Sequence, residues 1–156
     1  MAMQYPYLGK ESLEEKEKEK LGTEVVKKLT NNYIGDHRTV YMDSFFSDFD
    51  LSQYLLQNKM YSVGTCNSNR RFIPTTFKKN SRKRDIGAVY VYHDQMTLVN
   101  FKEKKNRNAV NVISTKHIGL QKEEVLPNIV KNYRKYMGGV DRFDQLCGNY
   151  TVQRCS

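Results

Sequence analysis

The stretch TVYMDSFFSDFDLSQYLLQNKMYSVGT, residues 39–65, contains two β-favouring runs with a helical pattern between them. Residues 39–42 are rich in β-branched and aromatic side chains and end at Asp43, and residues 60–65 form the second run. A strand, a helix and a strand within so short a segment predict a βαβ unit with two parallel strands. Asp43 is then expected at the carboxyl end of the first strand.

The helix of this unit is indicated by Leu51, Tyr54 and Leu55, which recur at the spacing of one helical face. Asp50 precedes this pattern and is the expected N-cap, since aspartate accepts hydrogen bonds from the first backbone N–H groups of a helix.

Periodicity and turn residues also predict the secondary structure on either side of this unit. They predict a helix over 22–31, one or two strands within 88–101 around a turn at 93–95, a strand over 110–115, a helix opened by Pro127 and broken at Gly138-Gly139, and a last helix from Val140.

The balance of charge limits the classes of partner. The 156 residues include 26 Lys and Arg against 17 Asp and Glu, a formal net charge of +9. Such a surplus suits a polyanion, either nucleic acid or an anionic membrane surface, although a solvated basic surface remains an alternative. No apolar run approaches the length of a membrane-spanning helix, so we expect no membrane partner.

The cysteines and histidines do not form a recognisable metal or nucleophile motif. The three cysteines are odd in number and fit no zinc spacing: Cys66, Cys147 and Cys155. Reduced thiols are therefore expected, as in the cytosol or nucleus. The three histidines are scattered and expected at the surface: His37, His93 and His117.

Residues 67–84, NSNRRFIPTTFKKNSRKR, form a basic stretch with two interleaved aromatic rings, predicted as loop or irregular structure. Arginine and lysine neutralise phosphates, and aromatic rings stack on bases, so the stretch is a candidate DNA contact. A nuclear-localisation patch or a solvated loop would have the same composition. The candidate DNA-binding residues are Arg70, Arg71, Lys78, Lys79, Arg82, Lys83 and Arg84.

Three aspartates could take part in metal chemistry. Asp141 and Asp144 are three residues apart and share a face if helical, and Asp43 is expected at a strand end. Behind a glycine break, the first two would also be ordinary acids of a first helical turn, where the helix dipole favours negative charge. Convergence of all three would instead suit a hard divalent cation, which prefers oxygen ligands.

An ordered set of motifs covers nearly the whole chain. The motifs are YPYLG (5–9), LGTEVVKKL (21–29), YMDSFF (41–46), VGTCNSNRR (63–71), IP (73–74), VIST (112–115) and YRKYMGGVDRFDQ (133–145). In this order and spacing, the sequence resembles the catalytic region of piggyBac-type transposases and of piggyBac transposable element-derived proteins.

The resemblance implies an α/β, RNase H-like fold of the acidic-triad recombinase type, which cuts and joins DNA with Mg²⁺ or Mn²⁺. By position, Asp43 matches the second catalytic aspartate, Asp141 the third, and Asp144 the acid that follows it. All three are then implied catalytic and metal-binding residues. The resemblance further implies a DNA partner, a homodimer and a nuclear location.

The resemblance also implies how the chain divides into domains, and that the first catalytic aspartate and the first strands of the fold are missing. Residues 1–66 would be a partial core, 67–117 a basic β-rich insertion, and 118–156 the C-terminal core helices. The family's first catalytic aspartate lies upstream of the YPYLG motif, so the first strands are expected to be missing, the fold incomplete and the chain inactive alone. The alternative is a non-catalytic basic DNA-binding module co-opted from a transposase.

Overall fold

The computed structural model describes residues 21–78, 85–118 and 126–148. In chain order the elements are α1 (Leu21–Thr30), the short 3-10 helix η1 (Asn31–Tyr33), β1 (Thr39–Met42), α2 (Phe49–Gln57), β2 (Tyr61–Cys66), α3 (Thr75–Lys78), β3 (Gly87–His93), β4 (Met96–Lys102), β5 (Val110–Ser114) and α4 (Asn128–Gly148). No helix in these ranges is long and apolar enough to cross a membrane. The YPYLG motif at 5–9 lies outside them.

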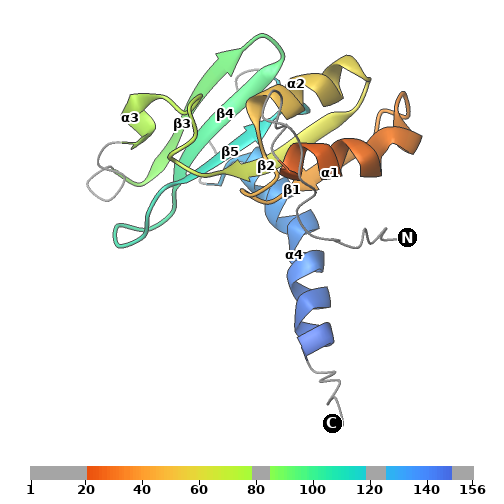
Figure 1. Ribbon diagram of the computed structural model, residues 1–156. Coiled ribbons are helices and arrows are strands. Elements are labelled where there is room, and N and C mark those ends of the chain that lie inside the picture. The colour runs from red at the N-terminus through yellow and green to blue at the C-terminus, as the bar shows by residue number, and fades with distance from the viewer. Residues whose placement is uncertain (1–20, 79–84, 119–125, 149–156) are drawn as a thin grey trace.

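A five-stranded mixed sheet in the order β1-β2-β5-β4-β3 forms the centre of the molecule (Figure 1). β1 and β2 pair in parallel, and α2 connects them in sequence, which confirms the predicted βαβ unit. The remaining pairs, β2–β5, β5–β4 and β4–β3, are antiparallel. The carboxyl ends of β1, β2 and β4 therefore lie at the same edge of the sheet.

The β2–β5 pair joins two parts of the sheet that are distant in sequence. At one end the backbone N–H of Ser62 donates to Thr115 Oγ1 at 2.8 Å, and the Thr115 N–H donates to the Ser62 carbonyl at 3.0 Å. At the other end Asn111 donates from Nδ2 to Ser68 Oγ at 3.1 Å. Ser62, Thr115 and Asn111 are buried, so these polar contacts help to specify the register of the pair.

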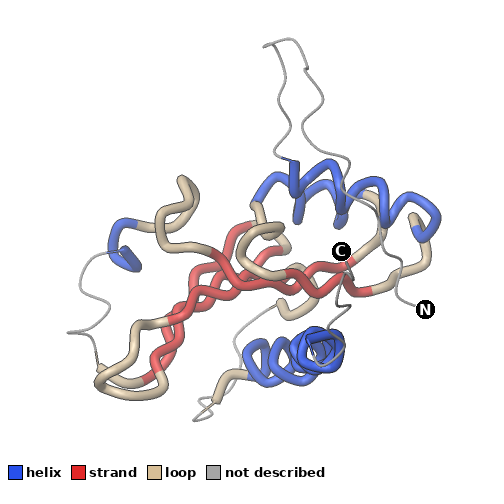
Figure 2. The backbone as a smooth tube through the Cα atoms, turned by 60° about the horizontal axis from the view of Figure 1, so that its bottom comes forward, coloured by secondary structure: helices blue, strands red, loops and turns tan. Residues whose placement is uncertain are grey.

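Helices cover both faces of the sheet, with α1 and α2 on one side and α4 on the other (Figure 2). Val26 of α1 and Leu51 and Leu55 of α2 pack against Met42 of β1. On the other face, Ile129 and Val130 of α4 belong to a core cluster with Val63, Val99, Phe101 and Val112. Burial of these apolar side chains is the main favourable contribution to folding.

The strands predicted within 88–101 and over 110–115 are confirmed as β3, β4 and β5. Asp94, in the two-residue turn between β3 and β4, has a φ of 50°, a conformation that aspartate tolerates better than most residues. The stretch 67–84 is irregular up to Pro74 and then forms the single helical turn of α3, while residues 79–84 lie outside the described part. The three strands continue the sheet of the βαβ unit, and the division into domains stays a prediction.

The N-cap of α2 is Asp48, so the expectation of Asp50 in this role is wrong. Asp48 has extended backbone angles, and its Oδ1 accepts a hydrogen bond from the Phe49 N–H at 2.9 Å. Asp50 lies in the first turn, where its negative charge still interacts favourably with the helix dipole. The helix predicted from apolar periodicity is confirmed. Its cap was misassigned because the sequence Asp48-Phe49-Asp50 offers two aspartates that could serve as N-cap.

Helix α4 runs without interruption through Gly138-Gly139, so the predicted break is wrong. A glycine inside a helix costs only about 1 kcal/mol relative to alanine, which lowers helix stability without excluding the helix. Packing of the first half of α4 on the sheet offsets that cost. Asp141 and Asp144 consequently lie in the second half of α4, where stabilisation by a helix N-terminus does not apply.

His117 is half-buried, contrary to the expectation of a surface histidine, whereas His37 and His93 are exposed. Its Nδ1 contacts Ser114 Oγ at 2.9 Å and its Nε2 contacts Asn132 Nδ2 at 2.6 Å, so it links β5 to α4. Burial lowers the pKa of His117 below its ordinary value, and the charge of Lys116 acts in the same direction.

We predict that His117 makes the fold less stable in mild acid. The unfolded histidine takes up a proton near pH 6.5, whereas the folded one does so only at lower pH. The unfolded state therefore binds more protons in this window, and the free energy of unfolding falls as pH decreases below about 6.5. Denaturant titrations between about pH 5 and 8 should show a shallower pH dependence for His117→Gln. A matched change at an exposed histidine, His37→Asn, should leave the dependence as it is, and equal slopes for all three proteins would contradict the prediction.

Candidate active site

Asp43 directly follows β1 and presents an exposed carboxylate at the carboxyl edge of the sheet. Its Oδ1 accepts hydrogen bonds from the Ser44 N–H at 2.6 Å and from Thr65 Oγ1 at 3.2 Å. Among the described residues these are the hydrogen bonds that the exposed carboxylate accepts. In open α/β sheets, ligands bind outside the carboxyl ends of the strands, which is where this carboxylate lies.

A line of hydroxyl groups connects this carboxylate to α4. Thr65, in the neighbouring strand β2, lies 3.2 Å from the phenolic oxygen of Tyr133. Because the single Thr65 hydrogen is directed to Asp43, Tyr133 donates to Thr65. Both residues belong to the motifs quoted above, but their role was missed because hydroxyl side chains far apart in sequence carry no spacing signal.

The turn after β1 is folded tightly over β2. The Asp43 carbonyl accepts hydrogen bonds from the N–H groups of Phe46 at 3.1 Å and Ser47 at 3.0 Å, and from Ser47 Oγ at 3.0 Å. A Cβ on Gly64 would overlap Ser47 Oγ and lie 2.9 Å from the Met42 carbonyl oxygen. Glycine at position 64 therefore allows the turn to approach β2 closely.

Arg70, one of the predicted DNA-binding residues, contacts the protein itself. Its Nη2 donates to the carbonyl oxygens of Ser44 at 3.2 Å and Phe45 at 3.1 Å, which holds the turn after β1. Arg71 and Lys78 are exposed and remain candidate DNA contacts. The other predicted basic residues lie outside the described part: Lys79, Arg82, Lys83 and Arg84.

A cavity of about 370 Å³ opens beside Asp43 and is called the Phe45 cavity here. It is lined by Ser44, Phe45, Asn67, Asn69 and Arg70, which follow the carboxyl ends of β1 and β2. Its lining combines an aromatic ring with amide and guanidinium groups, so it can contact both the flat face and the polar edge of a ligand.

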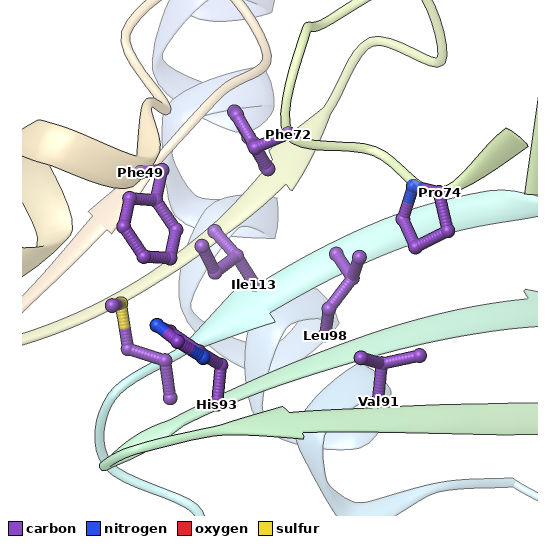
Figure 3. Close-up of a pocket in the computed structure, with 8 residues that line it drawn as sticks. Phe49, Phe72, Pro74, Val91, His93, Leu98 and Ile113 are labelled. Atoms are coloured by element: carbon purple, nitrogen blue, oxygen red, sulfur yellow. The ribbon is translucent and has the colours of Figure 1, made fainter.

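A second cavity, of about 260 Å³, lies between α2 and the outer strands and is shown in Figure 3. Its lining is almost entirely apolar: Phe49, Phe72, Pro74, Val91, His93, Met96, Leu98 and Ile113. Phe49 lies 6.0 Å from Phe72 and 5.8 Å from His93 between ring centroids. Apart from His93, the lining side chains are apolar, so this cavity suits an apolar ligand.

Cys66, at the end of β2, is a buried thiol. Burial raises its pKa to about 12, and the nearby Arg70 charge opposes this effect only in part. The thiol is therefore protonated at neutral pH and is a poor nucleophile, because the thiolate is the reactive form.

The path of α4 carries its C-terminal half past the edge of the described sheet. Ile129 and Val130 pack against β4, β5 and β2, and Tyr133 bonds to β2. Tyr136 then stacks on Tyr41 of β1, with ring centroids 4.5 Å apart. Because β1 is the last strand in the sheet order, the following turns of α4 project beyond the described strands (Figure 1).

Position 141 lies in the half of α4 that follows these contacts. It stands five residues after Tyr136, about 7.5 Å farther along the helix axis. Earlier in the helix, Arg134 donates to both carboxylate oxygens of Glu103, at 3.2 and 3.1 Å, directly after β4. The ends of β1 and β4 share one edge of the sheet, so Glu103 and Asp43 both lie at that edge.

Asp43, Asp141 and Asp144 are the acids that could share a divalent cation. Asp43 fits this role, because an exposed carboxylate is a ligand that Mg²⁺ and Mn²⁺ prefer. Among the side chains that the structure describes, no three His, Cys, Asp or Glu residues gather as a metal site. The side chains of Asp141 and Asp144 are not among them, so the shared metal site stays a prediction.

We predict that Gly64→Ala destabilises the fold, because the added methyl group meets Ser47 and the Met42 carbonyl. Overpacking of this kind typically costs about 1–3 kcal/mol. The same substitution at Gly138, where an added Cβ would meet nothing within 4 Å, should stabilise α4 by about 1 kcal/mol. Urea unfolding midpoints measure both changes, and Ser47→Ala should recover part of the loss in the Gly64→Ala background. Shifts of the same sign for Gly64→Ala and Gly138→Ala would contradict this account.

Comparison with known proteins agrees with this arrangement of sheet and helices. The family model described as Transposase IS4 matches residues 1–156. The chain is also similar to a piggyBac transposase solved as a synaptic complex with hairpin DNA, at 33% sequence identity and a TM-score of 0.76. The match covers 92% of this chain and 30% of that one, so this chain spans less than a third of the length of that transposase. The predicted α/β, RNase H-like fold class is thereby confirmed. The chain belongs to the Transposase IS4 family of DDE-type transposases and has the fold of the piggyBac catalytic domain.

Proposed function

We propose that this chain is a segment of a transposase catalytic domain that binds DNA along the carboxyl edge of β1 and β2. The observation that carries the proposal is the exposed Asp43 carboxylate at this edge, in a chain matched over its whole length by a transposase family. The piggyBac relative was solved bound to DNA, and the net charge of +9 suits the same polyanion.

The proposed metal ligands are Asp43, Asp141 and Asp144, with Mg²⁺ or Mn²⁺ as the cation. Support comes from the path of α4, whose second half, with positions 141 and 144, follows the stacking of Tyr136 on the edge strand β1 that ends at Asp43. A divalent cation there would polarise a phosphodiester and stabilise charge on its oxygens. The protein's part is to hold Asp43 through Thr65 and the Ser44 N–H.

We propose that the 156-residue chain by itself binds DNA without completing cleavage and strand transfer. Phosphoryl transfer of this kind uses two cations about 3.5–4 Å apart, which several carboxylates must hold together. The chain spans 30% of the piggyBac transposase that it matches, and the remaining acids of a complete site would come from further sequence or a second copy. Nuclear location and homodimerisation belong to the same proposal.

A second candidate function is a DNA-binding module without catalysis. The exposed Arg71 and Lys78 favour it, because phosphate contacts by such residues need no metal. The two functions differ in whether DNA affinity and metal binding depend on Asp43.

We predict that Asp43→Asn weakens Mn²⁺ binding by at least about tenfold, because a neutral amide replaces a charged ligand. Mn²⁺ titration followed by electron paramagnetic resonance measures the affinity. The matched control is Asp50→Asn, which removes an exposed acid from α2 without touching the site. Unchanged Mn²⁺ affinity in Asp43→Asn would contradict the metal assignment and favour the non-catalytic module.

We predict that DNA affinity is salt-dependent and falls on charge reversal of Arg71 and Lys78. Each phosphate contact that is lost should lower the slope of log K against log salt by about 0.9 for duplex DNA. Fluorescence anisotropy with a blunt duplex over a range of salt measures this slope. Lys116→Glu, at the opposite end of the sheet, is the matched control and should change the slope less. Salt-insensitive binding, or equal effects of both changes, would count against the DNA-binding edge.

A further inference from the structure

Phe45 is a large apolar side chain left exposed directly beside the candidate catalytic carboxylate. Its relative exposure is 61%, the highest among the exposed large hydrophobic residues of the described ranges. It stands two residues after Asp43 and lines the Phe45 cavity. An aromatic ring exposed at a polar cavity indicates a ligand contact more strongly than a ring alone on a surface.

The turn holds the Phe45 ring in place from one side. Phe46 meets it edge to face, with centroids 5.0 Å apart and an interplanar angle of 87°. The backbone of Gly22 in α1 approaches so closely that a Cβ there would lie 3.2 Å from the Phe45 carbonyl oxygen and 3.5 Å from its ring. Arg70 also binds that carbonyl. The ring is therefore preorganised, which lowers the entropy cost of binding a ligand.

The lining of the cavity also includes groups that can recognise the edge of a base. Asn67 and Asn69 are exposed, and the Asn69 N–H donates to Asn67 Oδ1 at 3.0 Å, which fixes the turn between them. The buried side chain of Asn111 anchors the same turn through Ser68. Asparagine amides both donate and accept hydrogen bonds, as the edges of bases require.

We propose that the Phe45 cavity binds an unpaired DNA base, which stacks on Phe45 with its edge toward Asn67 and Asn69. This rests on the proposed function, because the base would belong to the strand whose phosphate is handled at Asp43. Inside a duplex, neighbouring base pairs cover both faces of a base, so an aromatic side chain stacks on an interior base only after that base has left the stack. A purely apolar peptide would suit the second cavity, between α2 and the outer strands, better, since the Phe45 cavity is lined mainly by polar residues.

The test compares a duplex that ends in a short single-stranded overhang with a blunt duplex of the same sequence. Wild-type chain should bind the overhang duplex more tightly, and Phe45→Ala should lose about tenfold in affinity for it while keeping its affinity for the blunt duplex. Phe45→Tyr should retain the preference, whereas Phe45→Leu, which keeps apolar bulk without a π-face, should lose it. Tyr92→Ala, on the far strand β3, is the matched control for removal of an exposed ring.

A spectroscopic readout separates stacking from a general loss of binding. The chain contains no tryptophan, so Phe45→Trp introduces a single indole at the proposed site, which can be excited selectively over the 11 tyrosines. Its emission should be quenched by the overhang duplex and much less by the blunt duplex. Equal quenching by both duplexes would overturn the proposal.

Further results would also overturn the proposal and leave the proposed function standing. These are a wild-type chain that binds blunt and overhang duplexes equally, and a Phe45→Leu variant that keeps the overhang preference. Failure of the wild-type chain to bind either duplex would instead overturn the proposed function, and the base-binding site with it.

Discussion

The close approach of the β1 turn to Gly64 is the constraint on which the candidate site depends. No side chain fits at that position, because Ser47 and the Met42 carbonyl occupy the space above β2. The same turn carries Asp43 at its start and Phe45 at its tip, and Arg70 binds its carbonyl groups from the loop after β2. The packing of this turn on β2 thus positions both the carboxylate and the aromatic ring.

Helix α4 connects this turn to the rest of the molecule. Its first half is buried against the sheet, and Tyr133 bonds to the Thr65 hydroxyl that in turn bonds to Asp43. Its second half leaves the described sheet beyond β1. The helix therefore has two roles, as a core element over β4 and β5 and as a support that carries acids past the edge strand.

The βαβ unit, the β3–β4 hairpin and the position of Asp43 could be predicted from sequence, because each depends on local periodicity and turn residues. The continuity of α4 could not, because burial of Ile129 and Val130 against distant strands outweighs the local cost of two glycines. Composition marked Arg70 as a DNA contact, which stays a prediction, and gave no sign that its guanidinium binds a carbonyl group of a turn 25 residues away in sequence. The Thr65–Tyr133 contact joins residues 68 positions apart and leaves no pattern in the chain.

The β2–β5 pair has a consequence for how the molecule folds. β1, α2 and β2 are contiguous in sequence, as are β3, β4 and β5, so each half of the sheet can form from local contacts. Among the described strands, the β2–β5 ladder alone joins the halves by strand pairing, and its Ser62–Thr115 contact closes a loop across 53 residues. The entropic cost of closing that loop grows only slowly with loop length. However, the chain loses this entropy before any favourable contact across the ladder forms. Registration of the two strands is therefore the slow step expected in assembling the sheet, and the buried Ser62, Thr115 and Asn111 select the correct alignment at that step.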